Sequence, residues 1–369
     1  MKHAFLTAFF CFFLASNCYA QFYGFNKVDQ SLKATDQIEI TNMPPLMSQD
    51  SVANCYAFPA ANLLNAEVCR YEKIKCSELP QDQMFSPLGL ARYGRPEETK
   101  ESANLNAKNK NADALQGPDG GNSFNILNYV TRYLSAPSEK CMSLDRILSK
   151  VGGADQVNEM QVHAFQRLEQ MYSKSKKIKS DCADCLSNFY ASAQDEIEKN
   201  FDVKVSSDRL LKMFAQSTYT EFFDRLFTPS ECYRAKNSAF LESKVEPDSY
   251  PPEGIENGNY AGAIEQIKDT LTSGRPLALG NICGDKEPKP KDKKTKKPQC
   301  KAFHEVTVAG YRKVCDKKNK CRDVVKVINS WGKSWQEQND EGWLDAKSLL
   351  DRTFYEEGTL TWLKDKAQE

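Results

Sequence analysis

Apolar residues in the first part of the chain recur at the spacing of an α-helix. Between residues 55 and 73 they stand three or four positions apart, at Ala57, Ala61, Leu64 and Val68. The segment from Ser123 to Leu134 shows a helical pattern again. Side chains at this spacing share one side of a helix, so both segments are predicted to be helices that bury one face. The stretch from 95 to 122 is polar and contains several glycines, which predicts a loop.

The middle of the chain, from about 135 to 260, continues the helical pattern, whereas the last part is strand-like. One amphipathic helix is predicted through Val157, Met160, Ala164, Leu168 and Met171, and further helical structure through Leu210, Leu211, Phe214, Phe222 and Leu226. After about residue 270, short apolar runs at 277–279, 306–308 and 324–328 predict strands. A helical first part followed by a β-rich last part predicts an α+β protein.

The N-terminal segment is expected to be absent from the mature protein. Two basic residues follow the initiator, an almost unbroken apolar run extends from Ala4 to Ala15, and the small residue Ala20 stands at the expected cleavage point. This is the layout of a secretory signal over residues 1–20, and the run is too short to span a bilayer comfortably. Cys18 leaves lipid attachment open as an alternative. We therefore expect an exported protein, secreted or periplasmic, without stable membrane insertion.

Composition narrows the class of partner. The 369-residue chain is 40% hydrophobic and 27% charged, and its 50 basic residues balance its 50 acidic ones. A nucleic-acid-binding protein usually shows a strong basic bias, so no nucleic-acid partner is expected. One charge run stands out, with seven lysines between Lys286 and Lys297. It predicts a solvated loop, and a surface for an anionic partner is the alternative.

The cysteine content suits an oxidising compartment. Of the 13 cysteines, 11 remain once Cys11 and Cys18 leave with the signal. An odd number leaves one thiol over, and Cys55 is a candidate, although parity alone does not choose between it and an incidental unpaired cysteine. Ten others can then pair. Short-range disulfides are expected where a loop closes locally, joining Cys69 to Cys76, Cys283 to Cys300, and Cys315 to Cys321.

Two other uses of cysteine compete with structural disulfides. Cys182 and Cys185 have the spacing of a redox-active pair, but no βαβ pattern surrounds them. Zinc binding usually needs a second close pair, and Cys315 with Cys321 matches that requirement poorly. Structural disulfides are therefore the expected use, and neither a metal nor an organic cofactor is expected.

Histidine is rare, which narrows the choice of a general base. The chain has three histidines, one of which leaves with the signal. His163 lies in a predicted amphipathic helix, where a structural role is expected. His304 opens the strand-like segment HEVTVAGY, where a lone histidine is usually structural too. Its companions change the interpretation, because Gln49 and Cys55 lie upstream and Asn329 lies downstream.

These four residue types suit hydrolysis by a cysteine nucleophile. The reactive form of cysteine is the thiolate, which a helix N-terminus and a neighbouring imidazolium both stabilise. Cys55 stands where the helical pattern begins. His304 can move the proton and Asn329 can orient the ring. Gln49, with a backbone N–H, can stabilise the oxyanion of a tetrahedral intermediate.

Several segments resemble motifs of the papain-like cysteine peptidases, in that family's chain order. Segment 49–58, QDSVANCYAF, has a glutamine six residues before the cysteine and an aromatic-Ala-Phe after it. HEV at 304–306, followed by Gly310-Tyr311, is similar to the histidine strand, and NSWGKSW at 329–335 matches the asparagine motif with its second tryptophan. The remaining matches are Gly120-Gly121 with Phe124 and Tyr129, similar to a groove-lining glycine pair, and GRPLAL at 274–279. The resemblance covers roughly residues 43–134 and 265–365.

The resemblance implies a papain-like, two-lobed fold and a set of catalytic roles. A helical lobe over 43–134 would hold the nucleophile, and a β-barrel-like lobe over 261–369 would hold the histidine and the asparagine. Cys55 would be the nucleophile, His304 the acid and base, Asn329 the residue that orients His304, and Gln49 part of the oxyanion hole. The implied activity is hydrolysis of peptide or protein substrates through a thioester acyl-enzyme, as an endo- or exopeptidase.

The resemblance also suggests how substrate is held. Gly120 and Gly121 would let the substrate backbone approach closely, and Trp331 would shield the His–Asn hydrogen bond from water. Residues 21–42 would be a lead-in too short for the family's helical pro-region. Residues 135–260 would be a largely helical insertion, either a subdomain or a cover that restrains activity at the groove.

The chain departs from the family pattern near the nucleophile. Ala53-Asn54 stand in place of Gly-Ser, Tyr56 in place of tryptophan, Val52 in place of a cysteine, and Pro59 falls early in the predicted helix, where it could bend it. These changes affect the shape of the groove and leave the four catalytic residue types intact. The alternative function is a catalytically silent papain-like protein that binds peptides or a partner. An acyl transferase that uses the same thioester chemistry is a second alternative.

Overall fold

The computed structural model describes much of the chain as a mixed structure of helices and antiparallel strands, which confirms the α+β prediction. The described residues are 26–29, 31–50, 52, 54–94, 121–133, 136–151, 159–178, 182–228, 244–252, 254–255, 258–285, 300 and 302–367. The predicted signal, most of the predicted loop at 95–122 and the lysine run at 286–297 lie outside them.

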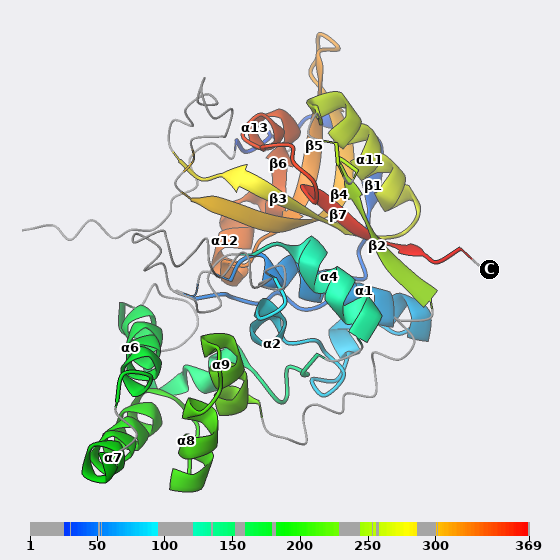
Figure 1. The fold of residues 1–369 in the computed structure, drawn as a ribbon. Helices are drawn as coiled ribbons and strands as arrows, with labels where there is room; N and C mark the ends of the chain where they lie inside the picture. Colours follow the sequence, from blue (N-terminus) through cyan, green and yellow to red (C-terminus); the bar gives the residue numbers. More distant parts are fainter. Residues whose placement is uncertain are drawn as a thin grey trace, which may run out of the picture.

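A seven-stranded antiparallel sheet forms one half of the described structure (Figure 1). Its order is β2-β7-β3-β4-β5-β6, and β1 pairs with β4. The strands are β1 (Lys33–Glu39), β2 (Val245–Tyr250), β3 (Leu277–Cys283), β4 (Phe303–Cys315), β5 (Cys321–Ile328), β6 (Trp343–Asp345) and β7 (Leu360–Asp365). The three strands predicted from apolar runs are confirmed within β3, β4 and β5. Among the described strands β2 and β6 do not pair, so this sheet is open and the barrel-like closure is not confirmed.

Strand β4 is the longest and changes partners along one edge. Its first half pairs with β3, with Val306 opposite Leu279, and its second half pairs with β1, with Gly310 opposite Glu39. Strand β5 runs along the other edge. Residues 304–311 are all buried, because helices cover both faces of the sheet here. A continuous apolar run rather than strict alternation is the pattern expected of such a strand.

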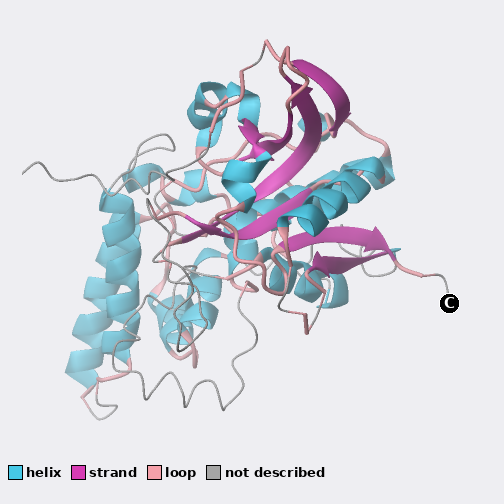
Figure 2. Ribbon diagram, turned by 90° about the horizontal axis from the view of Figure 1, so that it is seen from above, coloured by secondary structure: helices cyan, strands magenta, loops and turns pink. Residues whose placement is uncertain are grey.

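Helices pack on both sides of the sheet (Figures 1 and 2). On one side lie α1 (Ala57–Glu72), α2 (Pro87–Ala91) and α4 (Ser123–Tyr133). On the other lie α11 (Tyr260–Thr272) and α13 (Ala346–Leu350), while α12 (Gly332–Gln338) follows the loop after β5. The predicted helices at 55–73 and 123–134 are thus confirmed.

Helix α1 is more deeply buried than its sequence pattern indicated. Every residue from Ala57 to Cys69 is buried, not one face alone, because α2, α4 and the sheet surround the helix. Pro59 is the third residue of α1. The first four N–H groups of a helix have no partner within it, so the proline removes no intrahelical hydrogen bond. The bend considered for Pro59 is therefore not required.

The region after residue 135 forms a separate group of helices at the lower left of Figure 1. Its members are α5 (Leu144–Ile147), α6 (Glu159–Ser175), α7 (Ala183–Asn200), α8 (Ser207–Phe214) and α9 (Tyr219–Phe227). The helical pattern through 210–226 is two helices, because Thr218 forms a capping box with Glu221 and starts a new one. Strand β2 also lies within 135–260 but pairs with β7, so the helical part ends before Val245.

The helical group shares an apolar core with the first part of the chain. Its buried side chains cluster with Val52, Phe58 and Leu88. An ion pair between Arg92 and Asp224 joins the end of α2 to α9, and both side chains are largely buried. The helical group is therefore fastened to the segment that carries Cys55.

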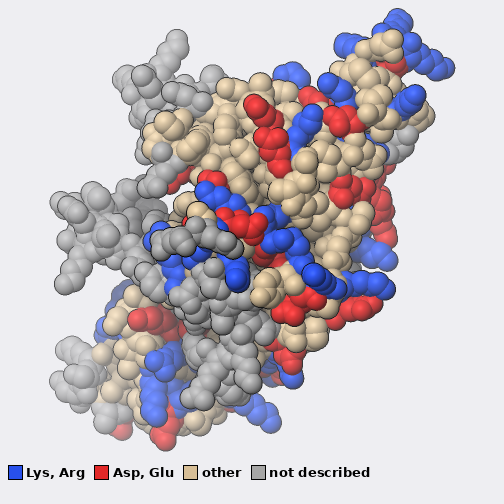
Figure 3. All heavy atoms as spheres, turned by 90° about the vertical axis from the view of Figure 1, so that its right-hand side faces the viewer, with Lys and Arg blue, Asp and Glu red and all other residues tan. Residues whose placement is uncertain are grey.

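Charged side chains form a buried network between α1 and the sheet and are mixed in sign on the surface. Glu67 of α1 and Arg275, which precedes β3, form a buried pair at 3.2 Å, and Arg275 also bonds Asp365 at the end of β7. Figure 3 shows basic and acidic side chains intermixed on the face turned to the viewer. This mixture agrees with the balanced charge of the sequence.

Candidate functional site

The candidate base and its orienting residue lie at one edge of the sheet. His304 is the second residue of β4, and Asn329 directly follows β5. The β4–β5 register sets Thr307 opposite Ile328, which brings both residues to the same edge. His304 Nε2 lies 2.8 Å from Asn329 Oδ1. Since the amide oxygen accepts, Nε2 carries the proton, and the lone pair of the neutral ring is on Nδ1.

Trp331 covers this pair. Its ring stacks on the His304 imidazole, with centroids 4.7 Å apart and an interplanar angle of 27°. Trp335 meets Trp331 edge-on at 5.9 Å. His304 is 4% exposed and Asn329 is 1% exposed, so their hydrogen bond is removed from bulk water. A hydrogen bond in a dry site is electrostatically stronger than one in water.

Cys55 lies in the turn that leads into α1, and it is half-buried. Within the described part of the chain it is the one cysteine outside a disulfide. The backbone N–H groups of Glu305, Tyr56 and Cys55 itself favour the thiolate form. Because Glu305 is the neighbour of His304 in β4, the structure brings the thiol to the start of the strand that carries the candidate base.

Burial dominates the electrostatics of this site. It raises the pKa of the Cys55 thiol to about 12, the nearby Glu305 carboxyl adds to the increase, and the three backbone N–H groups oppose it. The helix-start effect expected from the sequence therefore acts in the expected direction but is outweighed. Burial also lowers the pKa of His304 to about 4, against the opposing effect of its bond to Asn329. Each group is neutral when it titrates alone, because an isolated charge is costly in a buried site.

Gln49 is held beside the asparagine segment. Its backbone N–H donates to Ser330 O at 2.8 Å, its Nε2 donates to Val52 O at 2.9 Å, and its Oε1 accepts from Ser330 Oγ at 2.5 Å. These bonds fix the side-chain amide, which has a second N–H to offer. Thus Gln49, His304, Asn329 and Trp331 lie in one connected region.

The glycine pair is described only in part. Gly120 lies outside the described residues. A Cβ on Gly121 would come within 2.7 Å of the Tyr56 ring and 2.8 Å of Gly94 O, so only glycine fits there. Tyr56, which stands where the family has tryptophan, is buried and donates its hydroxyl to Ala91 O at 2.9 Å. Gly121 therefore has a packing reason to be glycine, and its role in substrate binding stays a prediction.

Glu305 is the notable residue that sequence reasoning missed. It is 4% exposed, and its carboxyl accepts hydrogen bonds from the backbone N–H and hydroxyl of Ser123 at the start of α4. Burial raises its pKa to about 8, and the bonds to Ser123 oppose that increase. The signal was present in the sequence, because a carboxylate within the apolar run HEVTVAGY is unusual and requires a partner.

The three short-range disulfides expected from the sequence are present, joining Cys69 to Cys76, Cys283 to Cys300, and Cys315 to Cys321. A further disulfide joins Cys182 to Cys185 at the start of α7. Cys141 is also disulfide-bonded.

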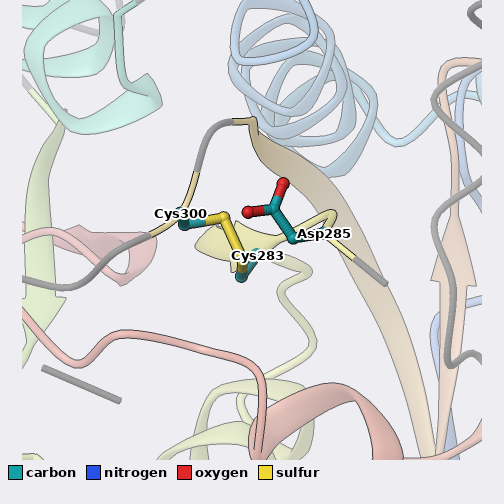
Figure 4. Close-up of side chains that lie close together, drawn as sticks. All are labelled: Cys283, Asp285 and Cys300. Atoms are coloured by element: carbon teal, nitrogen blue, oxygen red, sulfur yellow. A yellow bond between two sulfur atoms is a disulfide. The ribbon is translucent and has the colours of Figure 1, made fainter. Parts of the chain in front are cut away.

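One group of potential metal ligands consists of Cys283, Cys300 and Asp285 (Figure 4). The two sulfurs are 2.04 Å apart, as a disulfide. A metal needs deprotonated thiolates, which this disulfide does not offer. The two cysteines therefore link residue 283 to residue 300 as a disulfide, and the three residues do not form a metal site.

Three further predictions concern His163, the lysine run and membrane insertion. His163 is exposed on α6, and its Nδ1 lies 3.1 Å from Gln166 Oε1 of the same helix. The lysine run, predicted to be a solvated loop with an anionic-partner surface as the alternative, lies outside the described residues. Within the described residues, no helix is both long enough and apolar enough to span a membrane.

No protein-family model and no curated protein matches the chain. Among solved structures it is similar to xylellain, a cysteine protease from Xylella fastidiosa, at 11% identity and a TM-score of 0.39, covering 95% of this chain and 97% of that one. A SERA5E structure from Plasmodium falciparum has 13% identity and a TM-score of 0.40, covering 89% and 92%. The proform of Amb a 11, a ragweed pollen cysteine protease, has 12% identity and a TM-score of 0.37, covering 90% and 66%. Such values do not establish a shared fold or activity.

Proposed function

We propose that this protein is an exported, papain-like cysteine peptidase that hydrolyses peptide bonds through a thioester acyl-enzyme. The observation that carries the proposal is the hydrogen bond between His304 and Asn329, which Trp331 covers. The residue after His304 in the same strand is Glu305, and its backbone N–H favours the thiolate form of Cys55. A nucleophile, a base and a residue that orients the base form the constellation that acyl transfer requires. The papain-like two-lobed arrangement belongs to this proposal.

Formation of the nucleophile is the first step. A proton moves from Cys55 Sγ to Nδ1 of His304, which gives a thiolate and an imidazolium together. Burial opposes each charge alone, as the raised thiol pKa and the lowered imidazole pKa show. Two opposite charges made side by side stabilise each other, so the transfer costs much less than either ionisation alone. Asn329 stabilises the imidazolium because it accepts from Nε2.

Acylation and deacylation then follow. The thiolate attacks the substrate carbonyl carbon, and the oxyanion accepts hydrogen bonds from the Gln49 amide and the Cys55 backbone N–H. The imidazolium of His304 donates its proton to the leaving nitrogen as the C–N bond breaks, which leaves a thioester on Cys55. His304 then removes a proton from water, which attacks the thioester and releases the acid and the free thiol.

Turnover of a panel of short fluorogenic peptides tests the proposal. We expect hydrolysis by the wild-type protein and none by Cys55→Ala. Peptide binding without turnover by either protein would favour the catalytically silent alternative. Analysis of the products with an added amine separates hydrolysis from acyl transfer, because a transferase would form the amide in preference to the acid.

A further inference from the structure

A pocket of about 200 Å³ opens beside the candidate site, between segments that are far apart in the sequence. Leu46 and Met47 come from the segment before Gln49, Phe58 from α1 and Pro87 from α2. These four side chains give the pocket apolar walls. The helical region adds two carboxylates, Glu139 and Asp145.

The pocket adjoins two residues of the proposed mechanism. Its lining includes Ser48, which precedes Gln49, and Gly332, which follows Trp331. Ser48 and Trp331 also pair as an isolated antiparallel bridge. In the proposed reaction His304 protonates the leaving nitrogen, and Trp331 lies on His304. In that reaction the leaving part of a substrate would lie near His304 and Trp331, and the pocket adjoins Trp331 through Ser48 and Gly332.

The charges of the pocket favour a cation. Glu139 Oε2 is buried without a hydrogen-bond partner among the described residues. Burial, with a smaller effect from Asp145, raises the pKa of Glu139 to about 7, while the Ser143 and Ser86 hydroxyls and Arg146 lower it. Arg146 is outside the lining and donates to the carbonyl groups of Cys141 and Asp202.

One basic residue does belong to the lining. Lys333 is 80% exposed, and its Nζ lies 3.5 Å from Glu337 on the same helix. Its charge is therefore shared with a carboxylate at the surface. Glu139 also lines the pocket, and a buried carboxylate is costly to ionise without a cationic partner, so a ligand cation would stabilise its charged form.

We propose that this pocket binds the side chain of a lysine or arginine in the substrate, on the leaving-group side of the scissile bond. The apolar walls suit the methylene stem of such a residue, and the Glu139 carboxyl suits its charged end. The inference deepens the proposed peptidase function and rests on it. It assigns a substrate preference to residues of the helical region, which the family motifs do not contain.

The test compares internally quenched peptides that differ only in the first two residues after the scissile bond, as lysine or alanine. For the wild-type protein we expect kcat/KM to be about tenfold higher for the lysine peptide, the scale of one buried charge-assisted hydrogen bond. Glu139→Gln, which keeps the side-chain shape, should bring that ratio close to one. Glu246→Gln, which changes a half-buried carboxylate on β2 that pairs with Lys364, is the control and should keep the wild-type ratio.

The outcomes separate this inference from the function beneath it. Equal turnover of both peptides by the wild-type protein would overturn the cation pocket and leave the peptidase proposal standing. If neither peptide is cleaved, the peptidase proposal fails. Binding of the uncleaved peptides to the Cys55→Ala variant then shows whether the pocket prefers a cationic side chain. Fluorescence anisotropy should show tighter binding of the lysine peptide, weakened by Glu139→Gln. Equal affinities would contradict the pocket.

Discussion

The two sides of the candidate site are built in different ways. His304 and Asn329 stand at the edge of a sheet whose register sets their positions through paired backbone groups. The described residues of the segment from Gln49 to Cys55 form no such ladder. Val52 packs into the apolar core of the helical region. Asp50, whose φ is 50°, accepts a long 3.5 Å bond from the buried Gln161 of α6.

This difference predicts which core substitutions should change the geometry of the site. Backbone register resists loss of a single side chain, because many hydrogen bonds hold it in common. A loop held by side-chain packing responds to changes in the core it rests on. We therefore expect changes in the helical region to be felt at Cys55 and Gln49, and changes of equal cost elsewhere in the sheet core to leave the site intact.

The largest effect is expected from the reacting groups themselves. Cys55→Ala should abolish hydrolysis, since no nucleophile remains, and His304→Ala should reduce kcat by a factor of about 10⁶. Steady-state turnover of a short peptide measures both. Circular dichroism should show both variants folded, because neither change removes a large apolar side chain. Wild-type turnover by folded Cys55→Ala would reject the assigned nucleophile.

Removal of the orienting residue should cost less. Asn329→Ala deletes the acceptor for His304 Nε2 but transfers no proton, so kcat should fall roughly 10- to 100-fold, the scale of a hydrogen bond to a charged group. Asn329→Asp is a useful companion, because it keeps the acceptor and should raise the pKa of His304. A bell-shaped pH profile whose limits do not move in either variant would argue against contact between residue 329 and the catalytic base.

A matched pair of core substitutions tests the dependence of the nucleophile loop on the helical region. Leu168→Ala on α6 and Leu349→Ala on α13 each empty a fully buried site, at a cost of about 2–5 kcal/mol. Leu168 shares its cluster with Val52, whereas Leu349 packs in the sheet core. At a temperature where both are folded, only Leu168→Ala should lower kcat, by severalfold. Equal effects of the two substitutions on kcat would show that the nucleophile loop does not depend on the helical region more than on the sheet core.

Limited proteolysis within residues 135–260 extends this test. We expect a clipped but folded protein to change its rates on short peptides and on a folded protein substrate, because the helical region supports the loop and lines the pocket. If both rates stay unchanged, this region neither restrains nor supports the site.

The smallest effect on the reactivity of the site is expected from Glu305. Its pKa of about 8 lies above the ordinary value, so the folded protein holds this proton where the unfolded chain has lost it. Stability should therefore fall as pH rises from about 4.5 to about 8, and Glu305→Gln should remove that loss. Once ionised, Glu305 raises the thiol pKa. Thiol alkylation above pH 8 should thus be faster in Glu305→Gln, and identical rates would show that the carboxyl does not act on Cys55.

Much of this arrangement could be predicted from the sequence. The helix at α1, the strands β3 to β5 and three disulfides follow from periodicity and from short cysteine spacings. Gln49, His304 and Asn329 were found through motif order, and the structure brings them into one region. Full burial of α1 could not be predicted, because it depends on elements that pack around the helix from distant parts of the sequence.

The electrostatics and the pocket were also beyond the sequence. Helix-start effects predicted a lowered thiol pKa, but the extent of burial, which only the fold reveals, outweighs them. Glu139 and Asp145 belong to no sequence motif, because only the tertiary packing of the helical region brings them into one pocket with Ser48 and Gly332. Tertiary packing, not local pattern, decides both features.

The central claim is that Cys55 is the reactive thiol of a peptidase. Treatment of the native, unreduced protein with an epoxysuccinyl thiol inhibitor, followed by peptide mapping, tests it most directly. We predict a single modification, located on Cys55, with loss of hydrolysis in proportion to the labelled fraction. Modification at another cysteine, or full activity after complete labelling of Cys55, would contradict the account.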